Sequence, residues 1–103
     1  QTAAQRAPEV ALAWYNLGLM QRRGGDLAAA LEAYGRALAL DPNHAECHQN
    51  NAVAQLLGGN IEAARTSFIR AIRLLQAQGR ADEATQLRDK VQGIVKLDTE
   101  AVA

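Results

Sequence analysis

The stretch GGDLAAALEAYGRAL, residues 24–38, returns 34 positions later as GGNIEAARTSFIRAI, residues 58–72. The glycine pair, an alanine pair and an Arg-Ala pair align, while Tyr34 becomes Phe68. Self-similarity at a fixed period of this length is typical of stacked repeat units, none of which can bury its apolar face alone. The sequence therefore predicts a chain built from copies of one helical unit.

Each copy has the pattern of two helices joined by a glycine pair. In the first copy, helical spacing of apolar residues predicts a helix over about 9–23. The glycines at 24–25 should end it, since glycine accepts the left-handed conformation at a helix C-cap. Asp26 is then placed to cap a second helix that ends near residue 40, before Pro42.

The second copy repeats this arrangement, with Asn60 as its capping residue, and a fifth helix is expected over 81–97. Helical periodicity predicts an inner face made of Trp14, Leu17, Gly18, Gln21, Leu27, Ala30, Tyr34, Ala37 and Leu38, then His48, Asn51, Ala52, Gln55, Ile61, Ala64, Phe68, Ala71 and Ile72, and finally Ala84, Leu87, Val91 and Ile94 or Val95. We expect one domain over residues 9–97, with unit one at 11–44, unit two at 45–78, a capping helix at 81–97, and flexible ends at 1–8 and 98–103.

Composition narrows the class of protein. A chain of 103 residues supports one domain, and its abundant alanine favours helix. Eleven basic and eleven acidic side chains cancel, which argues against a nucleic-acid or anionic-membrane surface. One cysteine excludes an internal disulfide, and no apolar run approaches the ~20 residues of a membrane span. Since the sequence begins at Gln1 rather than Met, it leaves open whether a targeting or anchor segment lies upstream. A cytoplasmic location is the simplest expectation.

These residues resemble the tetratricopeptide repeat family, whose pattern is Trp-x2-Leu-Gly-x2-Tyr, then Ala-x3-Phe, then Pro. Unit one carries that pattern at Trp14, Leu17, Gly18, Ala30, Tyr34, Ala37 and Pro42, with Gln21 in place of tyrosine. Unit two keeps Ala52, Ala64, Phe68 and Ala71 but departs at His48, Asn51, Gln55 and Gln76. The resemblance implies an all-α, right-handed solenoid of antiparallel helix hairpins, with two units and a C-terminal capping helix.

In this family the first helices of successive units line a concave groove that receives a partner peptide. By position, the resemblance assigns to this groove Leu12, Tyr15, Asn16, Leu19, Arg22 and Arg23 from unit one, Glu46, Gln49, Asn50, Val53, Leu56 and Leu57 from unit two, and Asp82, Thr85, Gln86 and Asp89 from the fifth helix. The apolar members predict an apolar floor with a polar edge. Alternatively, terminal segments cover them, or they pad the core of a small domain.

Two asparagines, Asn16 and Asn50, occupy the same repeat position. Their amides could grip a partner backbone, although asparagine is also common at this position in the family. Some family members bind chaperone C-termini through a two-carboxylate clamp of lysine, asparagine and arginine. Only Asn50 remains of such a clamp here, because Tyr15, Leu19, Asp82 and Gln86 hold other clamp positions. We therefore expect apolar anchors in the partner rather than an acidic C-terminal tail.

The residues His44, Cys47 and His48 have a helical spacing at which ligands can converge on a metal. The structural alternative is that His44 belongs to a turn, His48 takes the position of Trp14 in unit one, and Cys47 is a small buried hydrophobe. We predict no metal site and no cofactor. Because no nucleophile arrangement, phosphate loop or inward carboxylate pair is present, we predict no enzymatic activity.

The functional prediction is a protein–protein interaction module that binds a peptide or helix of a partner in its concave groove, as a scaffold or assembly adaptor. The expected ligand is an apolar-anchored peptide or a short amphipathic helix of another protein, not nucleic acid. The alternative is a self-association module, in which the groove or the fifth helix pairs with a second copy of the chain.

Overall fold

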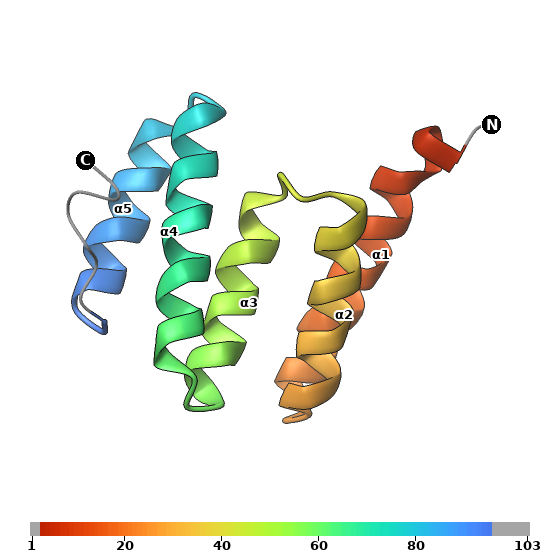
Figure 1. Cartoon of the computed structure of the whole chain (residues 1–103), viewed down its shortest axis with the longest axis horizontal. Coiled ribbons are helices and arrows are strands. Elements are labelled where there is room, and N and C mark those ends of the chain that lie inside the picture. The colour runs from red at the N-terminus through yellow and green to blue at the C-terminus, as the bar shows by residue number, and fades with distance from the viewer. Residues whose placement is uncertain (1–2, 96–103) are drawn as a thin grey trace.

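Five α-helices make up residues 3–95, the part of the chain that the computed structural model describes, and no strand occurs among them (Figure 1). Neighbouring helices pack together: α1 with α2, α2 with α3, α3 with α4, and α4 with α5. The predicted all-α stack of helix hairpins is confirmed. The helices are α1 (Ala3–Arg23), α2 (Leu27–Leu40), α3 (Ala45–Leu57), α4 (Ile61–Ala77) and α5 (Ala81–Gln92).

The same turn is used inside both units. Gly25 and Gly59 each have a φ of 86°, in the left-handed region that strains any residue with a Cβ. Directly after them, a side-chain oxygen of Asp26 accepts from a backbone N–H of α2 at 3.1 Å. Asn60 does the same for α4 at 3.2 Å. The predicted glycine stops and polar caps are therefore confirmed.

Helix α1 begins at Ala3, six residues before the start predicted near Glu9. Pro8 lies within this helix, close enough to its start that the lost hydrogen bond affects only its first turns. Residues 3–8 of the predicted flexible N-terminal end are thus helical. Residues 1–2 lie outside the described part of the chain.

Helix α5 ends at Gln92, earlier than the predicted end at Leu97. Val95 is buried whereas Ile94 is 58% exposed, so Val95 completes the apolar stripe of the capping helix. Residues 96–97 of that predicted helix, and the predicted flexible end at 98–103, lie outside the described residues.

The buried side chains form two clusters: one lies around α2 and includes Cys47 and Ala54 of α3, and the other lies around α4 and α5. In the first, Tyr34 is fully buried and packs against α1 where Gly18 leaves room for its ring. In the second, Phe68 and Ile72 of α4 contact the buried stripe of α5. This arrangement explains why two units and a capping helix occur together: α5 covers the apolar face that unit two would otherwise expose.

Besides Ile94, two predicted inner-face residues are exposed rather than buried or half-buried. Leu17 is 39% exposed, because no helix packs over that side of α1 among the described residues. Ile61 is 50% exposed, because it is the first residue of α4 and lies beside the turn. Those two assignments were wrong, whereas Ala30, Tyr34, Ala64, Phe68 and Ile72 are buried as predicted.

Candidate functional site

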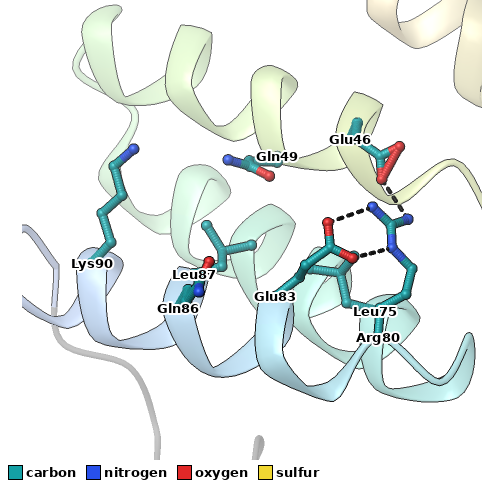
Figure 2. A pocket seen from close by; sticks show the side chains of 8 residues that line it. All are labelled: Glu46, Gln49, Leu75, Arg80, Glu83, Gln86, Leu87 and Lys90. Carbon is teal, nitrogen blue, oxygen red and sulfur yellow. Dashed lines mark hydrogen bonds and ion pairs between the residues drawn. The ribbon is translucent and has the colours of Figure 1, made fainter.

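A groove runs between α3 and α5, and one side chain from α1 joins it at one end. It consists of two adjoining pockets that share Gln49, Leu87 and Lys90. We call the larger one the apolar pocket; its volume is about 360 Å³. The smaller, the polar pocket, measures about 220 Å³ and is drawn in Figure 2.

The apolar pocket has an apolar floor and a polar rim. Its floor reaches the core, since Phe68 and Val91 are both buried. At the surface end, Ile94 is largely exposed. Apolar side chains on three helices form the floor: Val53, Leu56, Phe68, Leu87, Val91 and, just beyond the end of α5, Ile94. The rim consists of Arg22, Gln49, Asn50 and Lys90.

The polar pocket is organised by Arg80, which follows the turn at Gly79. Its guanidinium pairs with Glu46 of α3 at 2.7 Å and with both carboxylate oxygens of Glu83 at 2.6 and 3.0 Å (Figure 2). Hydrogen bonding from Arg80 holds the pKa of Glu83 below its usual value. The ion pairs join the start of α5 to the start of α3 and close this end of the groove with neutralised carboxylates.

Asn50 links unit one to unit two. Its amide nitrogen donates to the Tyr15 hydroxyl and to the Glu46 carbonyl oxygen, each at 2.9 Å. Its amide oxygen accepts from Nη2 of Arg22 at 3.2 Å. The pKa of Tyr15 is raised, mainly by burial. Its hydroxyl therefore stays neutral as it accepts the hydrogen bond from Asn50. The side-chain amide of Asn50 is therefore hydrogen-bonded within the chain. To bind a partner backbone, it would have to break these hydrogen bonds.

Of the sixteen residues that the resemblance assigned to the groove, seven line the two pockets. Arg22, Gln49, Asn50, Val53 and Leu56 line the apolar pocket, and Glu46, Gln49 and Gln86 line the polar pocket. Tyr15 and Leu19 are half-buried against the core of unit one. Neither pocket is lined by the exposed residues Leu12, Asn16, Arg23, Leu57, Asp82, Thr85 or Asp89.

On α5, the groove-facing edge lies one residue later than the resemblance implied. Glu83, Gln86 and Lys90 line the pockets. Of the implied residues Asp82, Thr85, Gln86 and Asp89, only Gln86 is among them. The cause is that α5 packs only on α4 among the described helices, so it need not keep the rotation of a first helix held between two neighbours. Lys90 lies three residues after the buried Leu87, so helical spacing from Leu87 would have predicted it. Alignment of α5 to the repeat pattern did not.

The residues weighed as metal ligands have other partners. His44 Nδ1 accepts from the backbone N–H of Cys47 at 2.9 Å and so caps α3. His48 Nε2 donates to the Pro42 carbonyl oxygen at 2.8 Å. Burial raises the pKa of the Cys47 thiol to about 12, which keeps it protonated. Within residues 3–95, no three His, Cys, Asp or Glu side chains are grouped so as to hold a metal ion.

The stacked hairpins, the repeated turn and the open lateral groove define a helical-repeat protein. Residues 11–44 match the model of the tetratricopeptide repeat family. Unit one thus carries a repeat of this family, and similar proteins that bear the family's name indicate the same. Human tetratricopeptide repeat protein 36 is 39% identical over 64 residues, which cover 62% of this chain and 34% of the relative. Human tetratricopeptide repeat protein 8 is 39% identical over 62 residues, covering 60% of this chain and 12% of that protein.

The chain thus spans about a third of the length of the first relative and less of the second. Tetratricopeptide repeats are protein-interaction modules, generally without catalytic activity, and the resemblance stated from the sequence is confirmed at that level. None of the helices within residues 3–95 is both long and apolar enough to cross a bilayer.

Proposed function

We propose that the chain binds a segment of another protein in the groove between α3 and α5, as a scaffold or assembly adaptor. The observation that carries this proposal is the apolar pocket, whose floor includes the half-buried Val53 and Leu56 and the exposed Ile94. Side chains of this kind at the surface gain about 25 cal/mol for each Å² of apolar area that a ligand covers.

The shape of the groove favours an elongated ligand over a small molecule. Glu46 and Leu56 mark its two ends on α3, and ten residues of helix span about 15 Å at 1.5 Å per residue. That length accommodates about five residues of an extended peptide or about three turns of an amphipathic helix. Either would place one or two apolar side chains in the apolar pocket and leave its polar side towards solvent.

A displayed library of random 16-residue peptides provides the test. Peptides enriched on the wild-type chain are synthesised with a fluorophore, and their affinities are measured by anisotropy. Val53→Asp should weaken binding about tenfold or more, because ligand binding would bury an unpaired carboxylate. Leu57→Asp is the matched control: Leu57 lies on the same helix, is 62% exposed and lines neither pocket.

Circular dichroism of both variants establishes that each retains its helices. Loss of affinity in Val53→Asp, with retained affinity in Leu57→Asp, supports binding in the groove. Equal affinity of Val53→Asp and wild type would show that the ligand binds elsewhere.

A second candidate function, self-association, rests on the outer face of α1. Val10 and Leu17 are exposed there, and Trp14 lies between them at helical spacing with the Arg36 guanidinium 5.0 Å from its ring centre. Two copies could bury this face against each other. Light scattering over a concentration series would show a dimer that Leu17→Asp dissociates; a monomer throughout would exclude this function over the range measured.

A further inference from the structure

We propose that the apolar pocket selects an internal protein segment in which a large apolar side chain neighbours an Asp or Glu, whose carboxylate lies between Arg22 and Lys90. This inference rests on the proposed binding of a protein segment in the groove. It adds the chemistry of the segment, which neither the family nor the named relatives specify.

The rim of the apolar pocket carries charges that complement an acidic ligand. Arg22 from α1 and Lys90 from α5 both line the apolar pocket, and no carboxylate is among its lining residues. The two carboxylates of the adjoining polar pocket, Glu46 and Glu83, are already paired with Arg80. The rim of the apolar pocket is therefore locally positive, although the charges of the whole chain cancel.

Both cations have hydrogen-bonding capacity left. Nη2 of Arg22 donates to Asn50, while its buried Nε has no hydrogen-bond partner in the described part of the chain. A buried N–H without an acceptor destabilises the free protein, and an acceptor on the ligand would remove that penalty. Lys90 makes no ion pair or hydrogen bond among the described residues. In Figure 2 it projects from α5 towards α3, at the opposite end of the polar pocket from Arg80.

The position of the cations favours an acidic side chain over a chain terminus. Lys90 lines both pockets, so the groove continues past it towards Arg80. A ligand whose C-terminal carboxylate stopped at Lys90 would leave the polar pocket empty, whereas an internal Asp or Glu lets the segment occupy both. Two cations beside an apolar floor also suit a single carboxylate rather than a phosphate backbone, which needs an extended basic surface.

The test uses the peptides enriched from the random library on the wild-type chain. We expect most of them to carry Asp or Glu within about four positions of a large apolar residue, one helical turn or less. The tightest acidic peptide is then measured against Lys90→Glu. Affinity should fall about tenfold at low salt, with a smaller loss at 0.5 M salt because ions screen an exposed charge pair.

The matched control is Arg70→Glu, which changes the net charge equally. Arg70 is exposed on α4 and lines neither pocket of the groove. Arg70→Glu should bind as the wild type does. Replacing the peptide's acidic residue with Lys should weaken binding to the wild type and restore binding to Lys90→Glu, a charge swap that a loss of folding could not produce.

The outcomes separate this inference from the proposed function. Enriched peptides without acidic residues, or equal affinities of Lys90→Glu and Arg70→Glu, overturn the inference; if Val53→Asp still abolishes binding, the groove remains the site. If Val53→Asp binds normally, the proposed function and the inference fail together.

Discussion

Replacing Gly18 with alanine tests how closely α1 approaches α2. A Cβ at this position would lie 2.6 and 2.7 Å from two ring carbons of Tyr34. Ordinary contact begins at 3.4 Å, so the ring would have to retreat by about 0.8 Å. Tyr34 is completely buried, so its ring can move only by displacing packed neighbours. The substitution should therefore strain the core of unit one.

The magnitude follows from two opposing effects. Overpacking of a well-packed core costs typically about 1–3 kcal/mol, and a clash this short with a fully buried ring belongs in the upper part of that range. Alanine also favours the helix over glycine by about 1 kcal/mol. The net expectation is that Gly18→Ala lowers the free energy of unfolding by about 1–2 kcal/mol.

Gly35→Ala is the matched control, because Gly35 is also inside a helix but has nothing within 4 Å of the position its Cβ would take. It should raise the free energy of unfolding by about 0.5–1 kcal/mol. Urea denaturation followed by circular dichroism measures both changes. If Gly18→Ala were stabilised as much as Gly35→Ala, the close packing of Gly18 against Tyr34 would be refuted.

Three further predictions use the same denaturation assay. Tyr34→Phe should be neutral or stabilising by up to about 1 kcal/mol, because the buried Tyr34 hydroxyl has no hydrogen-bond partner among the described residues. Unit two carries Phe68 at this position. Clear destabilisation by Tyr34→Phe would reveal a partner for that hydroxyl. Burial lowers the pKa of His48. His48 therefore binds a proton more readily in the unfolded chain than in the folded one, so the free energy of unfolding should fall as pH drops below about 6.5. The fall should be smaller in His48→Gln. If His48→Gln had the same pH profile as the wild type, the assignment of this pH dependence to His48 would be wrong. Deleting residues 80–103 should expose Phe68 and cause aggregation or loss of helical signal, whereas a soluble, fully helical product would show that α5 is not needed as a cap.

Much of the fold could be predicted because each unit carries its own local signals. Glycines at the turns and the capping residues Asp26 and Asn60 act within a few residues, and they lie where the sequence placed them. The buried face followed from helical periodicity wherever a neighbouring helix covers it. Leu17 carries the same periodic signal but is exposed, since periodicity cannot tell whether a further helix packs over that face.

The groove was harder to predict because its residues depend on how separate helices meet. The rotation of α5 places Lys90 in the groove beside α3, and Ile94 lines the same pocket just beyond the end of α5. No repeat of the sequence pattern marks that rotation. The bonds from Asn50 to Tyr15 and Arg22 join residues that are far apart in the chain. Such contacts follow from tertiary packing, which a single sequence does not reveal.

The most direct measurement of the central claim is an NMR titration of the ¹⁵N-labelled chain with the tightest library peptide. If the groove is the binding site, the amide shifts that change most should belong to α3, around Gln49 and Val53, and to α5, around Lys90, while α2 stays unperturbed. Changes concentrated on the outer face of α1, around Leu17, or on α4, around Arg70, would contradict the account.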